Sequence, residues 1–449
     1  MSKTRHRIRR EITYVEAKEE EVNILHQLGY HDKQAKFFSH LYSHREAVKN
    51  IVAHHLYLCS STVCHISNCV LVRFPLPYRV GDEFRPGNGD EKVRCEAATY
   101  AWLQENCPDI PISRLYGSAV STGETFTRLD RLPFVHRLIY YIQSRILSWL
   151  GRPVPSTYVP HPIKFDNPIQ CGYLLLEYIE PSRGSMLSNT WLDAQNNIKK
   201  RKNFFRGLSR VLLSMSRIPL PRIGSFTIDN PSYLALANRL LSAEIQLLQN
   251  EGIPTGINHE YTYSTTDSYV ADILTCHDNQ YRHQLNVIND VRDSIFQLSS
   301  LTAMRTISKL FLPRDSRRGP FVLSLTDLHS SNIFVDRDWN ITCLIDLEWA
   351  CSRPIEMIGT PHWLTDKAID GEVASEYDQI RREFMDVLVD EERNQPPSKG
   401  DLPILSEVMT QIWDSKTFWY TLALSSLSAL FTIFKEHIRP LYFSKYLEE

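Results

Sequence analysis

Two short runs of β-branched residues flank a turn signal late in the chain, and this pattern constrains the fold more than any other. Residues 333–335 (Ile-Phe-Val) and 341–345 (Ile-Thr-Cys-Leu-Ile) have the composition of strands, and Arg-Asp-Trp-Asn between them is typical of a turn. We therefore predict a β-hairpin. Antiparallel pairing about the turn sets position 332 opposite position 345, so Asn332 and Asp346 should meet at the open end of the hairpin.

Three oxygen-bearing side chains gather at this open end. Asp327 lies on the preceding loop, five residues before Asn332. Two carboxylates and an amide oxygen that converge on loop ends can hold a hard divalent cation. One carboxylate is then left to orient a hydroxyl group and accept its proton. The alternative is that Asp327 and Asn332 only cap turns.

Two charged residues stand alone on apolar elements. Residues 70–74 alternate like a strand that carries Arg73, and residues 91–105 repeat like a helix with Asp90 as its N-cap. Glu96 lies on the apolar stripe of that helix, where a carboxylate needs a cation. We therefore predict an Arg73–Glu96 ion pair, and a purely structural pair is the alternative to a functional one.

These segments resemble the aminoglycoside phosphotransferase and choline kinase family, in a divergent fungal-type branch. The family motif, H-G-D-x-x-x-x-N followed by a hairpin and I-D-[WF]-E, is matched by Leu-Thr-Asp-Leu-His-Ser-Ser-Asn at 325–332 and Ile-Asp-Leu-Glu at 345–348. Arg-Cys-Glu-Ala at 94–97, Phe-Pro-Leu-Pro at 74–77 and Tyr-Leu-Leu-Leu-Glu-Tyr-Ile at 173–179 add to the likeness. The resemblance covers most of residues 10–370.

The resemblance implies an ATP-dependent transfer of the γ-phosphate to a hydroxyl group of a small molecule. Asp327 resembles the catalytic aspartate, which orients the acceptor hydroxyl. Asn332 and Asp346 resemble the residues that hold Mg²⁺ on the ATP phosphates. His329, inside the motif, is expected to stabilise the loop, and Glu348 is expected to be structural.

The nucleotide contacts are carried over in the same way. Arg73 stands where the family has a lysine that touches the phosphates, and Glu96 is its partner on the helix. Glu177, Tyr178 and Ile179 resemble the hinge whose backbone meets the adenine. A buried strand end is the alternative for the hinge.

The implied fold is α+β and two-lobed, like a protein kinase, with a small antiparallel sheet in the N-lobe and a mainly helical C-lobe. We expect an N-terminal helical extension over 1–56, an N-lobe over 57–179 and a C-lobe over 180–449 with the catalytic hairpin at 321–350. Residues 144–168 read as an irregular insertion in the N-lobe.

Two departures favour a second hypothesis, a catalytically inactive pseudokinase that binds a metabolite or a partner protein. Leu325 replaces the motif histidine, and no glycine occurs between Gly29 and Gly81. Residues 57–69 are too few for two strands and a glycine-rich loop over the phosphates. The N-lobe therefore looks truncated, either because the protein is degenerate or because a segment is missing from the sequence.

Composition excludes other classes. Lys+Arg number 50 and Asp+Glu 52, so the formal net charge of -2 does not favour a nucleic-acid or membrane partner. Nine scattered cysteines and a polar, basic N-terminus predict free thiols in a cytoplasmic protein, a monomer or a dimer. The cluster of Cys59, Cys64, His65 and Cys69 lacks the usual zinc spacing. The uncharged run 417–434 is predicted to be a buried helix and not a membrane span.

Overall fold

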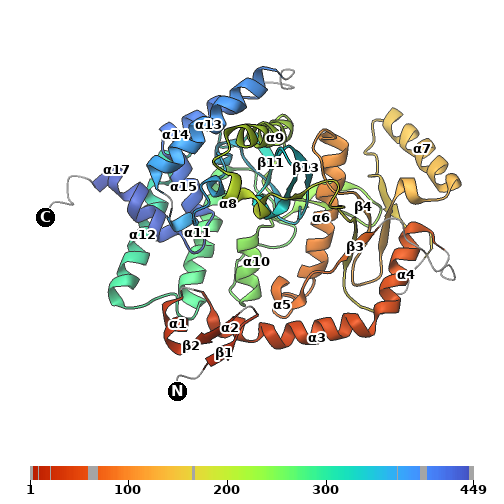
Figure 1. Ribbon diagram of the computed structural model, residues 1–449, viewed down its shortest axis with the longest axis horizontal. Coiled ribbons are helices and arrows are strands. Elements are labelled where there is room, and N and C mark those ends of the chain that lie inside the picture. Colours follow the sequence, from red (N-terminus) through yellow and green to blue (C-terminus); the bar gives the residue numbers. More distant parts are fainter. Residues whose placement is uncertain are drawn as a thin grey trace.

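Helices pack around small antiparallel sheets, so the fold is α+β as predicted (Figure 1). The structure is a computed structural model that describes residues 4–8, 10–20, 22–58, 69–163, 167–371, 373–394 and 402–443. Residues 59–68 lie outside the described part of the chain. The predicted absence of a glycine-rich loop and the Cys59, Cys64 and His65 cluster fall there.

The elements follow one another in an order that places most strands in the first half and most long helices in the second. The α-helices are α1 (Tyr14–Glu19), α2 (Ile24–Leu28), α3 (Tyr30–Ser43), α4 (Arg45–Leu56), α5 (Pro77–Val80), α6 (Asn88–Asn106), α7 (Phe134–Trp149), α8 (Trp191–Ala194), α9 (Ile198–Ser216), α10 (Ala243–Asn250), α11 (Thr266–His283), α12 (Val291–Phe311), α13 (Ala374–Arg393), α14 (Leu405–Asp414), α15 (Thr417–Leu424), α16 (Leu430–Ile433) and α17 (Arg439–Phe443), with a π-helical turn at Phe434–Ile438. The strands are β1 (Thr4–His6), β2 (Glu11–Thr13), β3 (Val70–Arg73), β4 (Leu115–Ala119), β5 (Thr125–Arg128), β6 (Tyr158–Pro160), β7 (Tyr173–Glu177), β8 (Ser185–Met186), β9 (Ser225–Ile228), β10 (Leu234–Asn238), β11 (Phe321–Leu325), β12 (Ile333–Val335), β13 (Ile341–Leu344) and β14 (Ala350–Pro354).

A five-stranded antiparallel sheet of order β3-β7-β4-β5-β6 forms the first half of the molecule. β3 pairs with β7 in a register that sets Arg73 opposite Leu174, so both side chains lie on the face covered by α6. β3 is an edge strand of the sheet among the described residues. Its N-terminal neighbours in the chain are residues 59–68.

The other face of the sheet is covered by α4. His55 of α4 lies against Gly117 of β4, and its ring nitrogens are 2.6 Å from Thr127 Oγ1 and 3.0 Å from the Tyr173 hydroxyl. Burial lowers the pKa of His55 well below its ordinary value, so the imidazole is neutral. The buried Ile51, one turn earlier, packs on the same face.

The predicted hairpin is confirmed. β12 pairs with β13 so that Ile333 lies opposite Leu344, and the Ile345 N–H donates to the Asn332 carbonyl at 3.0 Å. β8 adds a third strand to this sheet. β11, which leads into the Asp327 loop, pairs with β14, and Leu325 lies opposite Ala350.

Some predicted boundaries are wrong, because side chains and a glycine begin helices at unexpected places. Residues 14–28 form two helices, since the Asn23 side chain accepts from the His26 N–H at 3.1 Å and caps α2. α6 begins after Gly87, whose φ of +96° lies in the left-handed region. Asp90 is therefore inside the helix, and its carboxylate accepts from the backbone and hydroxyl of Ser121.

Two further predictions need correction. Residues 144–168 are not irregular throughout, because α7 extends to Trp149 and β6 forms the far edge of the five-stranded sheet. The run 417–434 is buried but is split into α15 and α16, since the Ser426 hydroxyl accepts from the Ala429 N–H at 3.1 Å and starts a new turn. No described helix is both long and apolar enough to cross a membrane.

We expect Gly117→Ala to lower the free energy of unfolding by about 1–3 kcal/mol, the usual cost of overpacking. A Cβ at this position would lie 2.3 Å from His55 Nδ1, so the imidazole would have to leave its two partners. Gly29→Ala is the control, because the atom nearest its added Cβ is 3.6 Å away. Equal denaturant midpoints for the two variants would contradict the contact between α4 and the sheet.

Candidate functional site

Arg73 is the centre of the candidate site. Its guanidinium donates to Glu96 Oε1 at 2.9 Å, to Asp346 Oδ1 at 2.7 Å and to Glu348 Oε2 at 2.5 Å. The predicted Arg73–Glu96 pair is therefore confirmed, and the structure adds two carboxylates that follow β13. One planar cation joins β3, α6 and the end of the hairpin.

Burial and charge oppose each other in this cluster. Glu96 is 1% exposed, and burial raises the pKa of its carboxyl although Arg73 lowers it. Burial also disfavours the charged form of Arg73, but Glu96, Glu348 and Asp346 together raise the pKa of the guanidinium above its ordinary value. Arg73 therefore stays protonated and compensates several carboxylates at once.

Lys92 belongs to the same cluster, and our sequence analysis missed it. Its ammonium lies 2.7 Å from Glu348 Oε2 and 4.8 Å from the centre of the Trp349 ring. Glu348 thus binds two cations, which supports the structural role predicted for it. Lys92 precedes Glu96 by four residues, so helical spacing alone places both on one face of α6.

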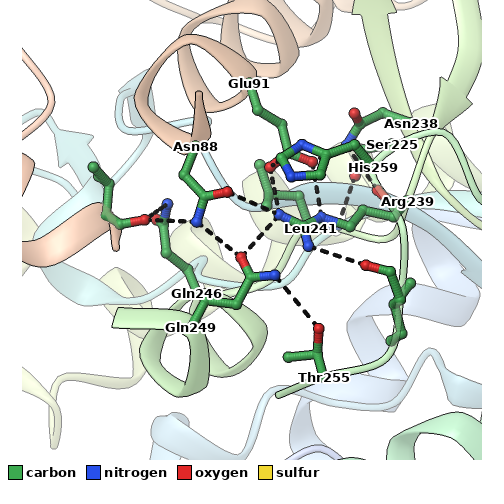
Figure 2. Close-up of polar contacts among 12 residues, drawn as sticks. Asn88, Glu91, Ser225, Asn238, Arg239, Leu241, Gln246, Gln249, Thr255 and His259 are labelled. Atoms are coloured by element: carbon green, nitrogen blue, oxygen red, sulfur yellow. Dashed lines mark hydrogen bonds and ion pairs between the residues drawn. The ribbon is translucent and has the colours of Figure 1, made fainter. Parts of the chain in front are cut away.

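A buried polar network holds α6 in place at its first turn (Figure 2). Arg239 follows β10, is completely buried and donates to both carboxylate oxygens of Glu91, at 2.8 and 2.5 Å. It also donates to Gln249 of α10 at 2.9 Å, and Asn88 donates to the same amide oxygen at 2.8 Å. These bonds satisfy a buried charge pair and attach α6 to β10 and α10.

The Asp327 loop is closed by its own side chains. The Asn332 amide donates to the Asp327 carbonyl at 2.9 Å, and the Thr326 hydroxyl donates to the Trp349 carbonyl at 2.6 Å. His329 Nδ1 accepts from the Ser331 N–H at 3.2 Å. These bonds agree with the loop-stabilising role predicted for His329 and with the turn-capping alternative for Asn332.

The Asp327 carboxyl has an unusual environment. Burial raises its pKa to about 6, and the negative charges of Asp346, Glu348 and Glu244 act in the same direction, while His329 lowers it. Its Oδ1 lies 3.8 Å from His329 Nε2. At neutral pH Asp327 is ionised but a stronger base than an ordinary aspartate, as proton abstraction requires.

Asp346 and Asn332 have the oxygen atoms that a magnesium ion prefers. Asp346 has φ of +59°, so the backbone takes the left-handed conformation that aspartate tolerates better than most residues. Asp346 Oδ2 and Asn332 Oδ1 accept no hydrogen bond from the described residues. These two atoms fit a hard cation, but Arg73 already binds the other Asp346 oxygen. No group of three or more His, Cys, Asp or Glu side chains among the described residues is arranged to hold a metal ion by itself.

A cavity of about 540 Å³ opens beside Asp327. Its walls come from α10, α11, the Asp327 loop, the segment after β14 and α15, and most of its lining is apolar. Glu244 and Arg353 are charged residues in this lining, and Arg353 donates to the Ser425 hydroxyl at 2.7 Å. Burial raises the pKa of the Glu244 carboxyl. Representative apolar residues of the wall are Leu240, Ile245, Leu248, Ile273, Phe418 and Leu424.

The predicted hinge is partly committed to internal contacts. The Glu177 N–H donates to the Arg114 carbonyl at 2.8 Å, and the Glu177 carboxylate accepts from the Arg114 N–H at 3.0 Å and from Arg183 at 3.1 Å. Tyr178 is exposed and Ile179 is nearly buried. A contact of residues 177–179 with adenine stays a prediction, and within it Tyr178 and Ile179 are freer than Glu177.

Comparison with known proteins identifies no relative. No protein-family model matches the chain. No curated protein matches it either.

We expect Arg73→Met to cost about 3–5 kcal/mol of unfolding free energy at pH 8, because it leaves buried carboxylates without their cation. The loss should shrink as the pH falls to 5. A carboxyl such as Glu96, whose pKa burial raises in the folded protein, contributes stability at low pH that is lost as the pH rises through the folded pKa.

The matched control is Arg393→Met, because Arg393 and its partner Asp390 are mostly exposed and 3.8 Å apart. That variant should lose less than about 1 kcal/mol at either pH. Denaturant titrations at the two pH values measure both effects. A pH-independent loss in Arg73→Met would mean that packing, and not charge, accounts for it.

Proposed function

We propose that the protein is an ATP- and Mg²⁺-dependent phosphotransferase, similar to aminoglycoside and choline kinases, that phosphorylates a hydroxyl group of a small molecule. The observation that carries the proposal is the position of Asp327. Its carboxylate, with a pKa of about 6, lies at a cavity of about 540 Å³ and close to Asn332 and Asp346. A general base, a place for its substrate and oxygen ligands for a cation are thus adjacent.

The proposal includes a two-lobed, kinase-like arrangement. The five-stranded sheet with α6 would be the N-lobe, within residues 57–179, and the hairpin with the later helices would be the C-lobe, within 180–449. The support is that Arg73 of β3 contacts both Glu96 of α6 and Asp346 after β13. A kinase-like site needs a basic strand residue in reach of both the helix glutamate and the metal-binding aspartate.

Asp327 would accept the proton of an acceptor hydroxyl held in the cavity. Asn332 fixes the loop backbone at the Asp327 carbonyl, so the carboxylate keeps its position during the reaction. Asp346 and Asn332 would hold Mg²⁺, which, when bound, neutralises charge on the phosphates. Arg73 orients Asp346 and adds a positive charge near it.

The alternative function is a pseudokinase, a binding module without phosphotransfer. The observation that favours it is the Arg73–Asp346 contact of 2.7 Å, because a guanidinium already balances the charge of the predicted metal ligand. The edge position of β3 in the described part of the sheet points in the same direction. A kinase would place the strands of its phosphate loop beside this edge.

We expect Asp327→Asn to lower the rate of ATP hydrolysis, with water in place of the acceptor, by about 10²–10⁴-fold, the usual share of a general base. Nucleotide affinity should be nearly unchanged. Asp338→Asn, in the exposed turn of the same hairpin, is the control and should keep full activity.

A stability measurement excludes misfolding as the cause. The folded pKa of about 6 exceeds the ordinary value of 3.8, so wild-type stability falls as the pH rises between these values. Asparagine cannot ionise, so Asp327→Asn should gain stability relative to wild type over that range. Full hydrolysis by this variant would remove Asp327 from the mechanism.

We expect Mg²⁺ to increase the affinity for ATP but not for adenosine, and Asp346→Ala to abolish that increase, because the ion would lose its anionic protein ligand. Calorimetric titration with adenosine, ADP and ATP, with and without Mg²⁺, measures this. The control is Asp366→Ala, since Asp366 has φ of +60° and therefore the same backbone strain. If wild-type protein binds ATP equally with and without Mg²⁺, the pseudokinase is the better description.

A further inference from the structure

Helix α7 exposes its hydrophobic side to solvent. The helix has 16 residues, none of them buried, and lies at the periphery of the molecule (Figure 1). Trp149 is 85% exposed, Phe134 72% and Ile139 57%. The other exposed apolar residues recur at helical spacing on the same side and continue to Leu150: Val135, Leu138, Ile142 and Ile146.

The opposite side of α7 attaches it to the protein. Arg137, Tyr140, Ser144 and Leu147, at steps of three and four, are its partly buried residues. The Tyr140 hydroxyl donates to the Pro155 carbonyl at 2.7 Å. A surface helix of a water-soluble domain normally turns its apolar stripe inward, and α7 does the reverse. Its apolar stripe is thus available to something outside the chain.

The segment that contains α7 is uniformly basic. Residues 131–163 include four arginines and no Asp or Glu, although the whole chain has a formal charge of -2. Arg137, Arg145 and Arg152 have no carboxylate partner among the described residues. The positive charge beside the apolar stripe is therefore uncompensated.

We propose that α7 binds the surface of a membrane that contains anionic lipids. An amphipathic helix with aromatic residues on its apolar stripe and arginines beside it can lie in the interface, with the stripe in the acyl region and the cations at the headgroups. Trp149 and Phe134, near opposite ends of the helix, are residue types that favour this boundary.

Charge argues against a second copy of the chain as the occupant. Two α7 helices packed stripe to stripe by two-fold symmetry would bring two sets of uncompensated arginines together. An anionic lipid surface instead supplies the missing negative charge. Our sequence-based expectation of no membrane partner rested on the net charge of the whole chain and on spanning segments, and neither describes one local helix.

The site of attachment is separate from the Asp327 site. α7 follows β5 and precedes β6, which forms the edge of the five-stranded sheet, whereas β3 with Arg73 forms the opposite edge. Binding through α7 therefore leaves Arg73 and its partners in place. The inference does not depend on the proposed phosphotransferase activity.

The test is sedimentation of the full chain with vesicles. We expect binding to vesicles of phosphatidylcholine with about one-third phosphatidylserine, and at least tenfold weaker binding to phosphatidylcholine alone or at high salt. Ile139→Glu/Ile142→Glu should weaken binding to the anionic vesicles by at least tenfold. Both side chains are exposed, so the double variant should unfold at the same temperature as wild type.

The matched control is Ile295→Glu/Leu298→Glu on α12, which replaces two exposed residues at the same spacing beside an acidic first turn. It should bind as wild type does. Failure of the wild-type protein to sediment with anionic vesicles would overturn the proposal, and so would equal binding by the α7 variant. A dimer in solution that Ile139→Glu/Ile142→Glu dissociates, without vesicle binding, would assign the stripe to a second copy instead.

Discussion

The buried Arg239–Glu91 pair fixes the helix on which the candidate site depends. Arg239 has no exposed surface, and its donors are used by Glu91, Gln249, Asn88 and a backbone carbonyl (Figure 2). Glu91 lies one turn before the residues of α6 that enter the Arg73 cluster. The position of α6 is thus set from β10 and α10, and the cluster is assembled on a helix that is already immobile.

The parts of the site that could be predicted from the sequence have local causes. The hairpin follows from two short strands and a turn, and its register then requires Asn332 and Asp346 to be neighbours. Arg73 and Glu96 could be paired because each is an isolated charge on an apolar element, and burial leaves such residues few alternatives. Composition and periodicity were sufficient for the α+β class.

The rest depends on contacts between residues far apart in the chain. Arg73 and Asp346 are 273 positions apart, and Arg239 and Glu91 are 148 apart, so no spacing rule connects them. Glu348 looked structural only because its partner Lys92 was not recognised. α7 was missed since an apolar helix without an inward face resembles an irregular insertion when only the pattern is read. The start of α6 depends on the conformation of Gly87, which composition does not reveal.

The three-way contact of Arg73 restricts how this chain can change over evolutionary time. A planar guanidinium can bond Glu96, Asp346 and Glu348 together, whereas a lysine ammonium is a single compact charge. Exchange of Arg73 for lysine in one step would leave a buried carboxylate short of its donor. An acidic neighbour would have to be lost first, and that loss alone would leave excess positive charge. Lineages that acquired the arginine with its extra carboxylate are thus separated from the lysine form by a poorly folded intermediate, so the exchange is effectively irreversible by single substitutions.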